Sequence, residues 1–218
     1  PNEHDYPNWQ KNWVELLAKA PNVKVGTAFK WPEPAQWESA QVVVFYYGNQ
    51  PWDDAKLGEM DAFLARGGGV VVIHAAVVPP KPQTDKLIER IGLVWQWGTT
   101  KWRHGKLDLK IAAPDEHPIT KGLPRQIAFL DETYWKMVKD VSRVKVLASA
   151  DEEGASWPMF WTFEPAKGRV YCSILGHYIQ CFDDPYLRLL LLRGICWAAG
   201  TEPHRLDALS IEGAKLAE

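Results

Sequence analysis

Two uninterrupted apolar runs constrain the fold of this chain most strongly. Residues 41–47 read QVVVFYY and residues 70–74 read VVVIH, the pattern of parallel strands whose two faces are both covered. Between them, Asp53 can cap a helix over 54–66 that the glycines at 67–69 end. Strand, helix and strand in this order predict an α/β fold, with a doubly wound, mostly parallel sheet and helices on both faces.

Other segments extend this pattern. Trp9, Trp13, Leu16, Leu17 and Ala20 share one face of a predicted helix over 8–20. Because a helix opens the chain, we expect one more strand to precede Pro1. One domain over 1–200 and a polar tail over 201–218 are expected. The remaining predicted elements are strands at 23–29, 106–113, 144–150, 158–164 and 168–174, and helices at 82–92 and 184–199. The strands at 158–164 and 168–174 should form an antiparallel hairpin.

Composition excludes several classes of protein. The 218 residues carry 25 Lys and Arg against 27 Asp and Glu, so no basic footprint for nucleic acid is expected. No window reaches the length of a membrane span, and no signal peptide is recognised, although bacterial cytoplasm and periplasm both stay open. The three cysteines form no CxxC pair and are expected to be buried thiols. Twelve tryptophans can stack on sugars, fill a core or anchor a homo-oligomer.

The histidines supply the first candidate site. His74 ends one predicted strand and His177 follows another, and the carboxyl ends of parallel strands meet at one rim of a sheet. His4 would reach the same rim if a strand ends just before Pro1. His104 lies in a predicted loop over 93–105, and His117 is predicted to be a turn or capping residue.

The acidic candidates are Asp5, Asp131 and Glu132. Asp131 and Glu132 precede Tyr134 and Trp135, and partial desolvation beside these rings would raise a carboxyl pKa and suit acid/base chemistry. The alternative is that they are surface carboxylates in a loop. Imidazole and carboxylate are ligands for a divalent metal such as Zn, Mn or Fe, and His74 and His177 are the candidate ligands. Hydrogen-bonded structural roles for these residues remain the alternative. No GxGxxG opens a helix, so no nucleotide cofactor is expected.

Six segments occur in the order seen in one family: EHDYPNW, GGGVVVIHAA, HPITKGLP, DETYW, GRVYCSILGH and RGICWAAG. The chain therefore resembles the ThuA-like (trehalose utilisation) family over about residues 2–200. The resemblance implies a flavodoxin-like sheet of the class I glutamine amidotransferase-like superfamily, whose members carry a cysteine nucleophile. Here His74 stands at the nucleophile position, and His177 is followed by Tyr178 and Ile179, so no glutaminase activity is expected.

The resemblance also implies a substrate class, trehalose and related disaccharides, handled through 3-keto-sugar intermediates. We expect an enzyme with His74, His177 and Glu132 as catalytic groups and a small sugar as partner. A non-catalytic sugar-binding or regulatory module, and a structural subunit of an oligomer, are the alternatives. The expected substrate-binding residues are His4, Asp5, Trp102, His104, Asp131, Trp135 and Trp157.

Overall fold

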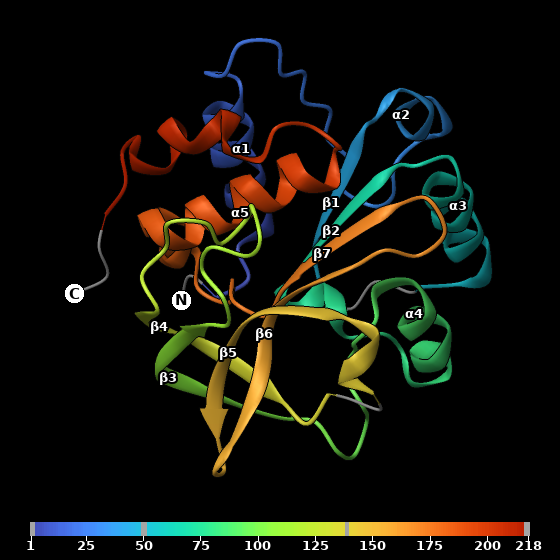
Figure 1. The fold of residues 1–218 in the computed structure, drawn as a ribbon. Coiled ribbons are helices and arrows are strands. Elements are labelled where there is room, and N and C mark those ends of the chain that lie inside the picture. The colour runs from blue at the N-terminus through green and yellow to red at the C-terminus, as the bar shows by residue number, and fades with distance from the viewer. Residues whose placement is uncertain (1–2, 49–51, 138–139, 216–218) are drawn as a thin grey trace.

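The two apolar runs form neighbouring parallel strands in a computed structural model, which describes residues 3–48, 52–137 and 140–215. Seven strands make one sheet in the order β1-β2-β7-β6-β5-β3-β4 (Figure 1). The strands are β1 (Val42–Tyr46), β2 (Gly69–Ile73), β3 (Lys101–Ile111), β4 (Gln126–Trp135), β5 (Lys145–Glu152), β6 (Ala155–Phe163) and β7 (Arg169–Ser173). The α-helices are α1 (Tyr6–Leu17), α2 (Pro34–Ser39), α3 (Asp54–Ala65), α4 (Thr84–Ile91) and α5 (Pro185–Ala198).

The parallel part of the sheet is its best-covered region. β2 pairs in parallel with β1 on one side and with β7 on the other, and Val70 to Ile73 are fully buried. Helix α5 packs on β2 and β7 from one side, while α3 and α4 pack from the other (Figure 1). The prediction that residues 42–47 and 70–74 are neighbours, with helices on both faces, is confirmed.

The prediction of a mostly parallel sheet is wrong, because the sheet is mixed. Only the β1–β2 and β2–β7 pairs are parallel, and β3, β4, β5 and β6 pair antiparallel. These strands form the lower part of Figure 1. The connections from β5 to β6 (residues 153–154) and from β6 to β7 (residues 164–168) are too short for a crossover helix, and such short connections join antiparallel neighbours. The predicted antiparallel hairpin is observed as β6 and β7.

Side-chain caps fix where the helices begin. The Asp5 carboxylate accepts the backbone N–H of Asn8 at the start of α1. Asp184 accepts the N–H groups of Tyr186 and Leu187 at the start of α5, and Asp53 caps α3 in the same way. Each cap satisfies backbone donors that have no partner within the helix. The caps therefore set the position of α1, whose first turn begins just beyond His4.

The predicted strand at 23–29 is not formed. These residues lie outside every strand of the described chain, and Val25 and Phe29 are 38% and 71% exposed. Their strand-like composition has no neighbouring strand to pair with, and a strand is stabilised by cross-strand contacts more than by propensity. In the part of the chain that the structure describes, β1 is accordingly one of the two edge strands of the sheet.

Three further expectations need correction. The loop predicted over 93–105 ends at β3, which begins at Lys101 and contains His104. Asp131 and Glu132 are buried in β4, so the alternative that they are surface carboxylates in a loop is wrong. The segment predicted as a polar tail is partly packed, since residues 203–211 form a 3-10 helix against α5 with Leu206 buried.

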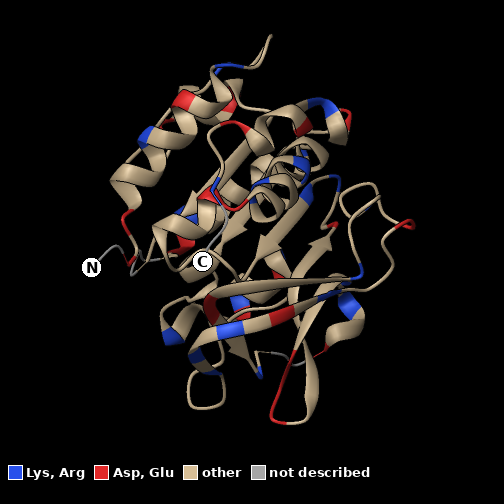
Figure 2. Cartoon of the chain, turned by 90° about the vertical axis from the view of Figure 1, so that its left-hand side faces the viewer, with Lys and Arg blue, Asp and Glu red and all other residues tan. Residues whose placement is uncertain are grey.

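The distribution of charge and the character of the helices can be described together. In Figure 2, acidic and basic residues are interspersed along the elements and form no stripe of one sign, in agreement with the balanced totals of 25 and 27. Within the described ranges, no helix has both the length and the apolar character needed to cross a bilayer.

Candidate functional site

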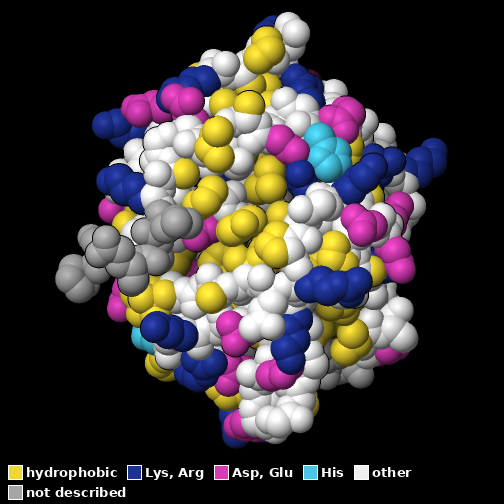
Figure 3. All heavy atoms as spheres, turned by 60° about the vertical axis from the view of Figure 1, so that its left-hand side comes forward, with side chains coloured by type: hydrophobic (Ala, Val, Ile, Leu, Met, Phe, Trp, Pro, Cys, Tyr) yellow, Lys and Arg dark blue, Asp and Glu magenta, His cyan; other side chains and the backbone are white. Residues whose placement is uncertain are grey.

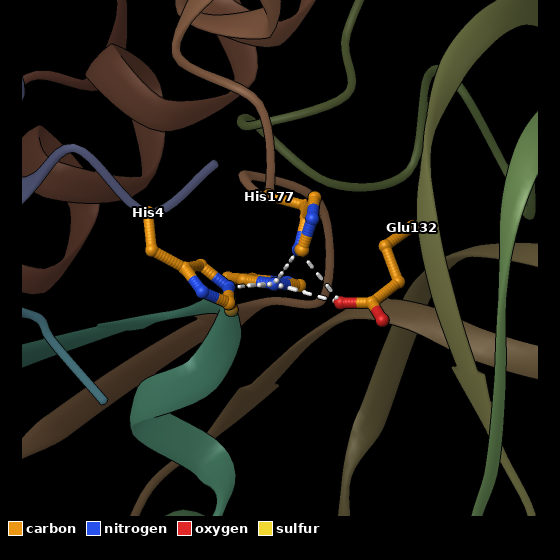
Figure 4. A group of neighbouring side chains, drawn as sticks. His4, Glu132 and His177 are labelled. Atoms are coloured by element: carbon orange, nitrogen blue, oxygen red, sulfur yellow. Dashed lines mark hydrogen bonds and ion pairs between the residues drawn. The ribbon is translucent and has the colours of Figure 1, made fainter. Parts of the chain in front are cut away.

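Four side chains from separate parts of the chain converge on one point. His4 comes from the segment before α1, His74 follows β2, Glu132 lies in β4 and His177 lies in the loop after β7. Their nearest nitrogen or oxygen atoms all lie within 4.8 Å of one another. Figure 4 shows His4, Glu132 and His177 pointing toward a common centre. The predicted meeting of His74 and His177 is observed, and we refer to these four residues as the histidine–glutamate cluster.

His74 is the centre of this cluster. Its Nε2 lies 3.0 Å from His4 Nε2, 3.2 Å from His177 Nδ1 and 3.1 Å from a Glu132 oxygen. Its Nδ1 donates to the backbone oxygen of Ile174 at 2.7 Å. The backbone at His74 has φ 53°, a left-handed conformation that costs a residue with a side chain about 1–3 kcal/mol. Such strain persists where the surrounding fold imposes it, and it is concentrated at functional sites.

A network of buried hydrogen bonds fixes the loop that carries His177. The Asp131 carboxylate accepts the N–H of Gly176 at 2.7 Å and the N–H of His177 at 3.0 Å. The Tyr46 hydroxyl donates to the backbone oxygen of Gly176 at 2.7 Å. Gly176 has φ +131°, and a side chain there would contact Phe182 and Ile73, so the tight turn requires glycine.

The N-terminal segment is attached to the same loop. The N–H of His4 donates to the backbone oxygen of His177 at 3.0 Å, and Glu3 forms an antiparallel bridge with Tyr178. The His4 ring also stacks on Tyr6, with centroids 5.7 Å apart. These contacts hold His4 against the cluster although it precedes the first helix.

β3 and β4 supply the opposite wall. Glu132 and Tyr134 are two residues apart on β4 and share a face, and the Tyr134 hydroxyl lies 3.1 Å from His74 Nε2. His104 is the direct partner of Glu132 across the β3–β4 pair, with its Nε2 3.3 Å from the second Glu132 oxygen. The His104 side chain is 37% exposed, whereas Glu132 is 7% exposed. His104 therefore lies between the buried cluster and solvent.

The protonation of the cluster follows from its contacts. Burial opposes ionisation of Glu132, but hydrogen bonds from His177 and His74 outweigh it and hold the pKa of Glu132 well below its usual range. Burial likewise disfavours a charged His177, but Glu132 raises the His177 pKa overall. Burial, followed by His74 and His177, lowers the pKa of His4 to about 4. The expected rise in carboxyl pKa is therefore wrong for Glu132, because two imidazoles face it. It is correct for Asp131, because burial raises the pKa of that carboxyl.

The other predicted site residues separate into two groups. Trp102, 52% exposed, stacks obliquely on His104 at 5.2 Å and so borders the cluster. Asp5 caps α1 instead. Trp135 alternates to the strand face opposite Glu132 and Tyr134, and the Trp157 indole donates to the backbone oxygen of Glu152. In the described residues, the side chains of Asp5, Trp135 and Trp157 form no hydrogen bond, ion pair or ring contact with the cluster.

The sequence patterns did not reveal the roles of three tyrosines. Tyr134 contacts His74, Tyr6 stacks on His4, and the Tyr178 ring lies 4.7 Å from that of His177. The i, i+2 spacing of Glu132 and Tyr134 was the available signal, because alternate residues of a strand share a face. The expectation for His117 as a turn residue is confirmed, since its Nδ1 accepts the N–H of Ile119.

A surface cavity of about 210 Å³ lies elsewhere, between α1, the loop after β7 and the C-terminal segment. Its walls include Trp9, Trp13, Ile179, Phe182 and Arg188. Figure 3 views this side of the molecule and shows hydrophobic side chains gathered across its middle. None of the four cluster residues lines this cavity. The cavity is therefore separate from the histidine–glutamate cluster.

Several known structures share the fold of this chain. A ThuA-like protein from Parabacteroides merdae superposes with a TM-score of 0.69 at 21% identity, covering 93% of this chain and 88% of that one. One from Bacteroides uniformis gives 0.67 at 20%, covering 93% and 90%. A protein from Salmonella typhimurium, described as cytoplasmic, gives 0.58 at 16%, covering 82% and 80%. These likenesses establish the fold alone.

A search of curated proteins returned no match. The family model described as "ThuA: Trehalose utilisation" matches residues 2–198, which include the cluster and all seven strands. The chain therefore belongs to the ThuA family, and the trehalose-utilisation description of that family indicates a carbohydrate-related role.

Proposed function

We propose that this protein is an enzyme that processes trehalose-like glycosides or their 3-keto derivatives at the histidine–glutamate cluster. The observation that carries the proposal is the convergence of three imidazoles on one ionised carboxylate, in a part of the molecule that is buried on one side and reaches solvent at His104. The family description supplies the substrate class. Acid/base chemistry and metal-assisted chemistry both suit this set of residues.

Acid/base groups of this kind could act on a 3-keto sugar by removing a proton next to its keto group. The keto group at C3 acidifies the C2–H bond, so a neighbouring base can take that proton. The electron pair of the C–H bond then forms an enolate, which a cationic group stabilises. The enolate can expel the glycosidic oxygen from C1, and an acid delivers a proton to that oxygen. Either His177 and His74 are the acid/base groups with Glu132 holding them in position, or the same three residues hold a divalent metal that would supply the cationic stabilisation.

Aromatic side chains near the cluster support a sugar as ligand. Trp102 presents an exposed ring beside His104, and Tyr178 lies 5.6 Å from the same imidazole. Aromatic rings pack well against the apolar faces of sugars. These rings fit a second candidate equally well, a sugar-binding or regulatory module without catalysis. In favour of that candidate, His74 stands where the superfamily's nucleophile is expected, and all three cysteines are free and buried.

Turnover separates the two candidates. Purified protein is incubated with trehalose and with 3-keto-trehalose, and product is followed by NMR. We expect turnover of at least one of them, and a His177→Ala variant should lower kcat/KM by at least about 100-fold, the usual scale of acid/base catalysis. His117→Ala, at a histidine outside the cluster, is the matched control. Saturable binding without turnover would support the module, and undiminished turnover in His177→Ala would contradict the proposed site.

A further inference from the structure

We propose that the histidine–glutamate cluster is a binding site for one divalent transition-metal ion. The ligands would be His4 Nε2, His74 Nε2, His177 Nδ1 and one oxygen of Glu132, the four atoms that converge. This inference rests on the same site as the proposed function and deepens it. Metal binding is nevertheless measured without any sugar, so each idea can fail independently of the other.

The hydrogen bonding of His74 is the first argument. The backbone oxygen of Ile174 can only accept, so His74 Nδ1 carries a hydrogen. In the neutral imidazole, Nε2 then presents a lone pair. A Glu132 oxygen, itself only an acceptor when ionised, lies 3.1 Å from that lone pair. Two lone pairs at this distance need a proton or a cation between them, and an Nδ1–H bond to a carbonyl is the usual way of presenting Nε2 to a metal.

The spacing of the donor atoms is the second argument. Ligand atoms about 2.0–2.1 Å from a tetrahedral ion are about 3.3 Å apart. In the structure, the donor atoms lie 3.0 Å apart for His74 and His4, 3.2 Å for His74 and His177, and 2.9 Å for His177 and Glu132. A modest outward movement of these side chains would admit an ion. All four donor atoms already lie within 4.8 Å of one another, so one ion could contact them after small side-chain movements.

The supporting contacts are the third argument. Metal ligands are usually held by an outer layer of hydrogen bonds, which fixes their orientation. Here Asp131 holds the backbone of His177, the backbone of His177 holds that of His4, and His104 lies at the second oxygen of Glu132. The ligands come from four separate segments, and each is fixed by the fold.

The ligand chemistry selects the class of ion. Three imidazoles and one carboxylate suit Zn²⁺, Mn²⁺, Fe²⁺ or Co²⁺, whereas Mg²⁺ and Ca²⁺ prefer oxygen ligands. Such an ion could take an oxygen of the sugar as a further ligand and stabilise negative charge developing there. His104, partly exposed beside Glu132, would then be the nearest imidazole outside the four ligands and a candidate for proton transfer.

The test measures binding to untagged protein that has been dialysed against a chelator. Titration calorimetry with Zn²⁺ and with Mn²⁺ should give one ion per chain, and Co²⁺ should produce a visible absorption band typical of nitrogen and oxygen ligands. His4→Ala and Glu132→Gln should each weaken binding by at least about 100-fold, since losing a ligand exceeds the roughly 10–100-fold cost of losing an outer partner. His74→Ala is a third variant, and circular dichroism checks its folding because His74 is fully buried.

Matched controls keep the result specific. His117→Ala removes a histidine outside the cluster, and Glu152→Gln neutralises a buried strand glutamate that pairs with Arg103. Both should bind the ion as the unsubstituted protein does. The proposal is overturned if no ion binds stoichiometrically, or if folded His4→Ala and Glu132→Gln bind as tightly as the controls. Stoichiometric binding without sugar turnover would retain the metal site and reject the proposed function, whereas sugar turnover by a protein that binds no ion would retain the proposed function and reject the metal site.

Discussion

Asp131 offers the sharpest test of how the site is held in place. It is fully buried, and its two oxygens accept three backbone N–H groups, from Glu132 at 2.9 Å, Gly176 at 2.7 Å and His177 at 3.0 Å. Asp131→Asn keeps the shape of the side chain but replaces one accepting oxygen with an NH₂ group. Whichever way the amide turns, a donor then faces at least one backbone N–H.

The size of the effect follows from those contacts. A hydrogen bond to a charged group contributes about 1.5–3 kcal/mol, and a buried donor left unpaired costs about 1–3 kcal/mol. The free energy of unfolding should therefore fall by roughly 3–5 kcal/mol for the single substitution. For a chain of this size each kcal/mol lowers Tm by about 2–4 °C, so we expect a loss of roughly 10 °C.

Urea unfolding followed by circular dichroism measures this loss. The control is Asp151→Asn, which breaks an exposed ion pair with Lys110 and should change the free energy of unfolding by no more than about 1 kcal/mol. If Asp131→Asn unfolds within about 1 kcal/mol of the unsubstituted protein, the carboxylate does not hold the His177 loop and the reasoning fails. Hydrogen exchange at the amides of Gly176 and His177 gives a local check, since both should exchange faster in the variant.

Three further predictions concern other parts of the molecule. Trp197→Ala should lower the free energy of unfolding by about 3–5 kcal/mol in urea titrations. The reason is that this ring in α5 is 9% exposed and lies under Arg169. A loss below about 1 kcal/mol would contradict its place in the core. Trp102→Ala should leave stability within about 0.5 kcal/mol, since the ring is 52% exposed, but should raise KM for the sugar in steady-state assays if Trp102 stacks on it. A thiol-specific dye should label no cysteine in the native protein and three in urea, because burial raises the pKa of each thiol; rapid native labelling would refute this for Cys172, Cys181 and Cys196.

The parallel half of the sheet could be predicted from sequence because its signal is local. Residues 42–46 and 69–73 are apolar at nearly every position, and each run is a strand in the structure. The strand predicted at 23–29 (VKVGTAF) contains strand-forming residues but has no partner strand among the described residues. Pairing is a property of two segments, so propensity in one of them could not decide it.

In the antiparallel half, β4 is the strand that was not predicted from the sequence. In β4, buried Ile127 and Phe129 alternate with exposed residues, a recognisable strand pattern that the carboxylates after Leu130 obscured. Without β4, the opposition of Glu132 and His104 could not be foreseen. The rim positions of His74 and His177 were predictable, because the residues at the carboxyl ends of parallel strands lie along one edge of the sheet.

His4 reaches the cluster only because residues 3–4 are attached to residues 177–178. Both segments lie outside the helices and named strands, so the position of His4 depends on how often this attachment opens. Such segments open locally at a small fraction of the global free energy of unfolding. A segment held closed by about 1.4 kcal/mol is attached in roughly nine molecules of ten, and weakening it by about 2.8 kcal/mol inverts that ratio. Apparent affinity for anything that needs His4 scales with the attached population. Glu3 and Tyr178 supply none of the converging donor atoms. Substitutions at these residues that weaken the attachment would therefore change the apparent affinity for such a ligand by up to about tenfold, because they shift the equilibrium between attached and detached segment.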